Sequence, residues 1–258
     1  MPFLRATSAA PTVDPMPAVD PVSASEPVPA SELRWDSAPD DPEGVVLVMH
    51  GGKVRSERAA RWGSLPVIRM LPISKSIARH GKGRLAVVRL RYAVRGWNGQ
   101  SASPLRDAAA TLDHISARYP GVPVALVGHS MGGRVALMLA GDPRVRAIVG
   151  LAPWIERTDH FPLPPGQRLL ILHGLSDRIT DPRASRLLVE SLRAGGHIAS
   201  FVGLARDKHA MVLRYRDWDE LTNGFIEAAL VHNATTTRPS ELGAIASRAT
   251  REGHVTLV

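Results

Sequence analysis

Short apolar runs alternate with longer amphipathic segments along the middle of the chain. The runs consist mostly of Val, Ile, Leu and Ala, whereas the longer segments repeat an apolar position every three or four residues. Uninterrupted apolar runs are typical of strands covered on both faces, and the 3.6-residue period is typical of the covering helices. The strands are expected within 44–52, 84–92, 122–130, 145–154, 168–174 and 198–204, and the helices within 65–81, 103–121, 131–143 and 181–196. This alternation predicts an α/β fold with a doubly wound, mostly parallel sheet and helices on both faces.

The two ends of the chain depart from this pattern. Residues 1–32 are rich in Pro, Ala, Ser and Val and hold almost no aromatic side chain. Frequent prolines disfavour helices and central strands, so a disordered leader is expected there. Residues 232–258 carry only one weak helical patch and are expected to form a tail or a loosely docked appendage. A single domain, 33–231, is then expected to hold the fold.

Composition narrows the class of protein. No apolar run approaches the roughly 20 residues of a membrane span, and the N-terminus lacks the apolar core of a secretory signal. A cytoplasmic protein without a membrane partner is therefore expected. The chain has no cysteine, which excludes disulfides, thiolate metal ligands and a cysteine nucleophile. Its net charge of +8 comes from scattered arginines rather than a basic run, so nucleic acid is not an expected partner.

One motif stands where an expected strand passes into an expected helix. Ser130 is flanked at two residues on each side by Gly128 and Gly132. An abrupt strand-to-helix turn leaves no room for a β-carbon at those two positions, and it pushes the apex side chain outward at the helix N-terminus. The positive end of the helix dipole favours a developing negative charge there. Ser130 is therefore predicted to be a nucleophile, although a glycine-rich turn with an incidental serine is the simpler alternative.

A serine nucleophile requires a base, and the base requires an orienting carboxylate. Asp177 follows the strand expected at 168–174, and His209 follows the strand expected at 198–204. Both therefore lie at the same edge of the sheet as Ser130, in the order serine, acid, base. Asp181 precedes Pro182 and is expected to cap the next helix instead.

Three other histidines lie near the predicted site. His50 and His173 end buried strands, where such residues more often pack or brace loops than act as bases. His129 adjoins the nucleophile and is expected to point elsewhere. His209 is the predicted base because only this histidine combines a strand-end position with the expected chain order.

These motifs together resemble those of the α/β-hydrolase superfamily, in its dienelactone-hydrolase-like and small esterase branch. The likeness spans about residues 34–230 and rests on HGG at 50–52, GHSMGG at 128–133, HGLSDRIT at 173–180 and DKHAM at 207–211. Dienelactone hydrolases use a cysteine nucleophile, which this chain lacks, so the resemblance extends to the fold and the site but not to that substrate. It implies an oxyanion hole formed by the N–H of Met131 and the N–H of Gly52, with Lys53 as the nearest alternative.

The substrate pocket is less well defined by the sequence. Only 13 residues, 155–167, separate APW from RLLILHG, which is too short for a helical cap domain, so an open site is expected. Trp154, Trp97 and Trp62 lie in strand-end loops near the serine and are candidates for lining the pocket, although aromatic residues in loops often serve only as anchors.

The predicted function is hydrolysis of a small-molecule carboxylic ester or thioester through an acyl-enzyme formed on Ser130, with Asp177 and His209 completing the triad. No metal and no organic cofactor is implied. Serine peptidase and perhydrolase chemistry use the same triad and remain alternatives. A noncatalytic ligand-binding protein of the same fold is a further alternative, but such proteins are expected to lack part of the triad. The acyl group, the leaving group and the oligomeric state stay open.

Overall fold

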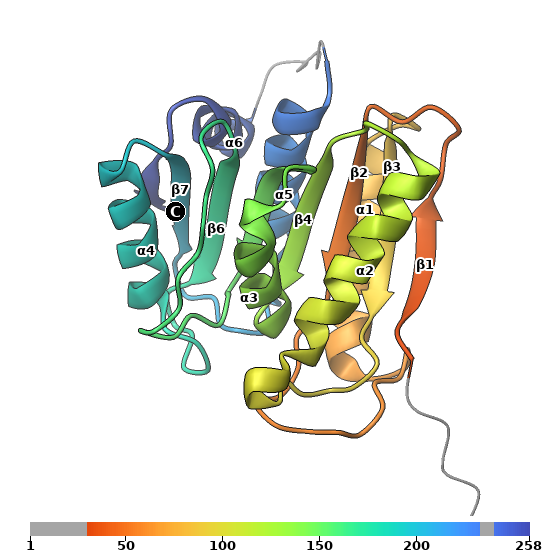
Figure 1. The fold of residues 1–258 in the computed structure, drawn as a ribbon. Helices are drawn as coiled ribbons and strands as arrows, with labels where there is room; N and C mark the ends of the chain where they lie inside the picture. The colour runs from red at the N-terminus through yellow and green to blue at the C-terminus, as the bar shows by residue number, and fades with distance from the viewer. Residues whose placement is uncertain (1–29, 233–239) are drawn as a thin grey trace, which may run out of the picture.

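A computed structural model describes residues 30–232 and 240–258, which form one mixed sheet with helices on both sides (Figure 1). Within these residues the sheet has eight strands in the order β1-β3-β2-β4-β5-β6-β7-β8. β1 runs antiparallel to β3, and every other neighbouring pair is parallel. The strands are β1 (Glu32–Ser37), β2 (Gly44–Met49), β3 (Leu85–Arg91), β4 (Val124–His129), β5 (Val145–Leu151), β6 (Arg168–Gly174), β7 (Ile198–Leu204) and β8 (Val255–Leu257). The predicted doubly wound α/β fold is confirmed.

Helices cover both faces of the sheet, and each face has a separate apolar core. The α-helices are α1 (Leu65–His80), α2 (Ser103–Arg118), α3 (Met131–Met138), α4 (Pro182–Ala194), α5 (Tyr215–Leu230) and α6 (Glu241–Arg251). Buried side chains of α2, α3 and α4 pack on one face, and those of α1, α5 and α6 pack on the other. β2 and β4 are buried along their whole length, which explains their uninterrupted apolar sequences.

The C-terminal segment differs from the expected tail or loosely docked appendage. In its described part, α6 packs on α5 and β7, and Ala246 and Ala249 on α6 are completely buried. β8 then pairs with β7 through the register Phe201↔Val255 to Gly203↔Leu257. The tail prediction is therefore wrong for residues 240–258, which extend the sheet. α6 buries only small side chains, Ala246, Ala249 and Thr250, so the sequence predicts no more than a weak helical patch here.

The other end of the chain shows a second difference. Residues 1–29 of the predicted leader lie outside the described residues, but Glu32 already begins β1. β1 pairs with β3 at the edge of the sheet, and Asp36 on β1 forms an ion pair with Arg89 on β3. Its sequence, ELRWDS, is largely polar because an edge strand is only partly covered.

Three of the parallel strands end at the same edge of the sheet, so the loops that follow them begin close together. β4, β6 and β7 all end at this edge, and their following loops carry Ser130, Asp177 and His209. Functional groups collect at the carboxyl ends of strands in sheets of this type. Among the described helices, none has the length and apolar character needed to cross a bilayer.

Candidate active site

Ser130 occupies the turn between β4 and α3 with an unusual backbone conformation. Its φ is 54° and its ψ is −114°, values that non-glycine residues rarely adopt. Three backbone hydrogen bonds hold this residue. The Ser130 N–H donates to the Leu151 carbonyl at 3.0 Å, and the Ser130 carbonyl accepts from the N–H groups of Arg134 and Trp154. The turn is thereby fixed to the end of β5.

The two glycines around Ser130 are required by close backbone contacts. A β-carbon at Gly128 would lie 2.1 Å from the carbonyl oxygen of Gly132. A β-carbon at Gly132 would lie 2.6 Å from the carbonyl oxygen of Met49, at the end of β2. Any other residue at either position would force the strand and the helix apart, which is the steric reason predicted for this motif.

Asp177 and His209 are brought into contact by the loops after β6 and β7. His209 Nδ1 lies 2.8 Å from Asp177 Oδ2, a hydrogen bond in which the ring nitrogen donates. The Asp177 side chain is buried, while His209 is partly exposed. This pairing leaves the other ring nitrogen of His209 free to accept a proton.

The Asp177 carboxylate accepts several further hydrogen bonds. Oδ1 accepts from the backbone N–H groups of Ile179 and Thr180, and Oδ2 accepts from the Thr180 hydroxyl and from Nε2 of His173. Burial by itself would raise the pKa of the Asp177 carboxyl, but the hydrogen bonds from His173, His209 and Ile179 hold that pKa well below its ordinary range. Asp177 therefore stays ionised. The sequence offered no signal that His173 would bind the acid.

His129 connects the loop of the predicted base to the predicted nucleophile. Its Nε2–H donates to the backbone carbonyl of His209 at 2.9 Å, and the two rings lie 4.7 Å apart. Among the described contacts, the Ser130 hydroxyl forms no hydrogen bond with His209. Such catalytic hydrogen bonds are often long or poorly aligned before substrate binds. His129 thus packs against the ring of the predicted base and braces the His209 loop.

The segments that carry the two predicted oxyanion donors pack against each other. A β-carbon at Gly52 would meet Sδ and Cε of Met131 within 2.6 Å, so the loop after β2 packs directly on the start of α3. The Lys53 N–H donates to the Arg95 carbonyl at 2.8 Å, whereas no backbone partner is present for the N–H of Gly52 or Met131 in the described part of the chain. This arrangement favours Gly52 over Lys53 as the second donor. His50 Nδ1–H donates to the Gly51 carbonyl and stiffens the same loop.

Two of the three candidate tryptophans lie beside the nucleophile turn. The guanidinium carbon of Arg134, on α3, lies 4.7 Å from the ring centre of Trp97 and 4.3 Å from that of Trp154. Trp97 is buried and Trp154 is half-buried. The two rings therefore join the loops after β3 and β5 to α3, and Trp154 is the more exposed of the two.

Trp62 lies elsewhere. Its indole Nε1–H donates to Glu32 at the start of β1, and Arg34 stacks on its ring at 4.3 Å. β1 is three strands away from β4 in the sheet, a separation of about 14 Å at roughly 4.8 Å per strand. The structure therefore brings Trp62 to the sheet edge and not to Ser130. Tryptophan in a strand-end loop cannot be assigned to a pocket without the strand order.

Arg134 also anchors the segment between β5 and β6. It forms ion pairs with Glu156 and with Asp159, whose side chain is only 4% exposed. Replacing Arg134 with Met is expected to lower the free energy of unfolding by about 3 kcal/mol, because the buried Asp159 carboxylate loses its cation. Urea unfolding measures this change. Arg186→Met, which breaks the exposed pair with Glu190, is the control and should change little. Equal losses in both variants would contradict the anchor.

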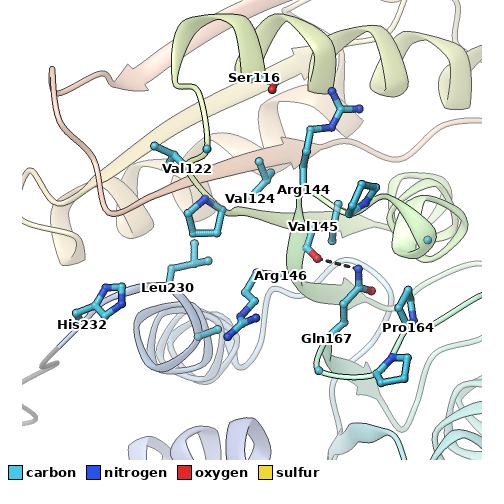
Figure 2. Close-up of a pocket in the computed structure, with 17 residues that line it drawn as sticks. Ser116, Val122, Val124, Arg144, Val145, Arg146, Pro164, Gln167, Leu230 and His232 are labelled. Carbon is cyan, nitrogen blue, oxygen red and sulfur yellow. Dashed lines mark hydrogen bonds between the residues drawn. The ribbon is translucent and has the colours of Figure 1, made fainter.

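One cavity of about 850 Å³ opens at the opposite edge of the sheet (Figure 2). Val124, Arg144 and Arg146 line it near the start of β4 and β5, and Gln167 lines it just before β6. Gln167 is held in place there by a hydrogen bond from its amide to the Val145 carbonyl. The cavity lies at the amino ends of the strands, whereas Ser130 and Asp177 follow the carboxyl ends. It is therefore separate from the candidate active site.

Comparison with known proteins places this geometry in context. A family model described as "Serine aminopeptidase, S33" matches residues 79–170, a range that includes Ser130 but ends before Asp177. No curated protein matches the chain. The chain is 19% identical to a serine hydrolase without a lid from Xanthomonas campestris, with a TM-score of 0.60 over 83% of this chain and 99% of that one.

Two esterase structures give similar values. Est1E from Butyrivibrio proteoclasticus, solved with ferulic acid, is 14% identical, with a TM-score of 0.58 over 78% of this chain and 96% of that one. A thermophilic esterase from Thermogutta terrifontis, solved with propionate, is 17% identical, with a TM-score of 0.60 over 76% of this chain and 88% of that one. These structural matches show that the chain has the α/β-hydrolase fold, and the family model matches the part of the chain around Ser130. Residues 152–167, all of them described, contain turns and no helix.

Proposed function

We propose that this protein is a serine hydrolase that cleaves a carboxylic ester or thioester of a small molecule. The observation that carries the proposal is the 2.8 Å hydrogen bond between His209 and the buried Asp177, at the sheet edge where Ser130 stands on a strained turn. A strained, partly exposed serine at the same edge of the sheet as an oriented imidazole is an arrangement that suits nucleophilic acyl transfer.

The reaction has two steps. Ser130 Oγ attacks the carbonyl carbon while His209 Nε2 takes the hydroxyl proton, and the leaving alcohol or thiol then receives that proton as the acyl bond breaks. A water molecule, deprotonated by the same nitrogen, releases the acid and restores Ser130. During both steps the N–H groups of Met131 and Gly52 would donate to the negative carbonyl oxygen, and the N-terminus of α3 adds its dipole.

Labelling with a fluorophosphonate tests the nucleophile. We expect one equivalent to attach to Ser130, because only an activated serine attacks phosphorus at a useful rate. Intact-protein mass spectrometry followed by peptide mapping identifies the labelled residue. Ser130→Ala should not be labelled, and equal labelling of the parent and this variant would show that another residue is the nucleophile.

The open site predicts the acyl preference. Residues 152–167 form a short segment anchored to α3 by Arg134, so this part of the chain forms no cap over a long apolar tunnel. We expect the highest kcat/KM with short and medium acyl chains in a series of p-nitrophenyl esters, and no activation at lipid interfaces. Emulsified long-chain triglycerides hydrolysed faster than short esters would contradict this expectation.

The family description favours one alternative, serine aminopeptidase activity. The same triad performs both reactions, so geometry at Ser130 does not separate them. An aminopeptidase must bind a free α-ammonium group, and aminoacyl p-nitroanilides compared with p-nitrophenyl esters reveal that preference. Thioesters in the same panel and peracid formation from hydrogen peroxide test the thioesterase and perhydrolase alternatives. A chain that hydrolyses none of these substrates and resists labelling would instead be a noncatalytic binder.

A further inference from the structure

His173 is a completely buried histidine that faces the predicted catalytic acid. It lies at the end of β6, four residues before Asp177, and its side chain has no exposed surface. Its Nε2 lies 3.2 Å from Asp177 Oδ2 and 3.2 Å from the Thr180 hydroxyl oxygen. His209 Nδ1 approaches the same two oxygens, at 2.8 Å and 3.1 Å. Two histidines, one on β6 and one in the loop after β7, therefore share one carboxylate oxygen.

Asp177 and Ser185, on α4, together determine which nitrogen of His173 carries the proton, because the carboxylate can only accept at Nε2. The Ser185 hydroxyl lies 2.8 Å from His173 Nδ1. If that hydroxyl donates to Nδ1, the neutral ring carries its proton on Nε2, toward Asp177. This tautomer gives both sides of the ring a partner, which buried polar groups require. A neutral donor at this place leaves the negative charge of Asp177 available to His209.

We propose that His173 is a positioning residue that holds Asp177 Oδ2 in place and limits the proton affinity of this oxygen. The inference rests on the proposed function, because it concerns the acid of the same triad. Hydrogen bonds donated to a carboxylate stabilise its charged form and make it a weaker acceptor for other donors. Without His173, Oδ2 would bind the Nδ1–H of His209 more strongly and favour the protonated imidazolium. That imidazolium cannot take the proton of Ser130, so catalysis would begin only at higher pH.

The groups around His173 come from three segments. Asp177 and Thr180 follow β6, Ser185 lies on α4, and His209 follows β7. The nearby buried carboxylate of Asp207 is bound by the indole N–H of Trp218 and the backbone N–H of Lys208. Asp177 is thus the anionic group that His173 contacts directly.

Three variants test the proposal in the full-length chain. His173→Phe keeps the ring volume and removes both nitrogens, His173→Gln can keep a donor near Nε2, and Ser185→Ala removes the group that directs the tautomer. Ser200→Ala, which deletes a buried hydroxyl on β7, is the matched control. In His173→Phe we expect kcat to fall about tenfold with KM unchanged, and the acid limb of kcat/KM against pH to move up by about half a pH unit. In His173→Gln the acid limb should return to its position in the parent protein. In Ser185→Ala it should move up by less than in His173→Phe.

A purely structural role predicts a different result. Replacing His173 would then lower the unfolding temperature but leave the acid limb of kcat/KM against pH unchanged. This outcome overturns the proposal. If His173→Phe does not fold, an unchanged limb in Ser185→Ala overturns it equally.

A spectroscopic measurement separates this proposal from the proposed function. The proton between His209 Nδ1 and Asp177 should give a far-downfield NMR resonance, which we expect to move in His173→Phe and to return toward its original position in His173→Gln. This readout needs no substrate. If the parent protein hydrolyses no ester and Ser130 is not labelled, the proposed function fails while the resonance still reports on His173. An identical resonance in the parent and His173→Phe overturns the positioning role.

Discussion

Replacing Asp177 with Asn is expected to lower ester turnover by about 10⁴-fold while the chain still folds. Oδ1 of Asp177 accepts two backbone N–H groups, from Ile179 and Thr180. In the variant the amide oxygen would take that position, and the NH₂ group would replace Oδ2 and face His209 Nδ1. A donor there forces the proton of His209 onto Nε2. The imidazole then cannot accept the proton of Ser130, and the serine stays unactivated.

Asp181 provides the matched control four residues away. It stands at the N-cap of α4, and its side chain accepts a hydrogen bond from the Arg183 N–H at 2.8 Å. Because Asn caps helices nearly as well as Asp, Asp181→Asn should leave turnover and thermal stability close to those of the parent. Ester hydrolysis and thermal unfolding of both variants decide the assignment. An inactive Asp181→Asn beside an active Asp177→Asn would move the acid to position 181.

Much of the fold follows from the apolar pattern. Strands covered on both faces are continuous apolar runs, so the six parallel strands from β2 to β7 could be located from the sequence. β1 and β8 could not be, because each is an edge strand with a partly polar sequence whose existence depends on a partner strand. α6 is amphipathic, but the side chains that it buries are small, so the sequence predicted only a weak helical patch there.

The candidate site shows the same division. The positions of Ser130, Asp177 and His209 just after β4, β6 and β7 could be predicted, because strand-end loops and glycine spacing are local features of the sequence. The contacts of Asp177 with His173 and of His209 with His129 depend on which strands are neighbours and on how the loops between them close. Trp62 could not be placed from the sequence for the same reason. Its loop begins at the same edge of the sheet as the candidate site, but its indole hydrogen-bonds to Glu32 on β1, a strand that the sequence did not predict.

Buried histidines also predict how the protein responds to acid. Burial, together with the nearby His209, lowers the pKa of His129 to about 3, and burial lowers the pKa of His50 to about 4, both from an ordinary value of 6.5. Each ring is neutral in the folded protein and becomes protonated in the unfolded chain once the pH falls below 6.5. The unfolded state then binds more protons, so stability is full above pH 6.5 and is lost as the pH falls toward 4.

Burial raises the pKa of Asp107 and of Asp219. As the pH falls, these two carboxyls are protonated in the folded state before the unfolded state, so they oppose the loss of stability. The loss of Asp177 ionisation acts in the destabilising direction, but only below the ordinary carboxyl value of 3.8. The loss of stability between pH 6.5 and pH 4 therefore comes mainly from His129 and His50. At 1.36 kcal/mol per pKa unit, each contributes on the order of 3 kcal/mol at pH 4.

We therefore expect the free energy of unfolding to fall by on the order of 5 kcal/mol between pH 7 and pH 4, a large part of the stability of a typical domain. Urea unfolding at several pH values measures this dependence. His129→Gln keeps a donor for the His209 carbonyl but cannot be protonated, so its stability should fall by about 3 kcal/mol less over the same range. His114→Gln replaces an exposed histidine on α2 and should follow the parent curve. Parallel curves for the parent and His129→Gln would show that His129 is not the source of the acid sensitivity.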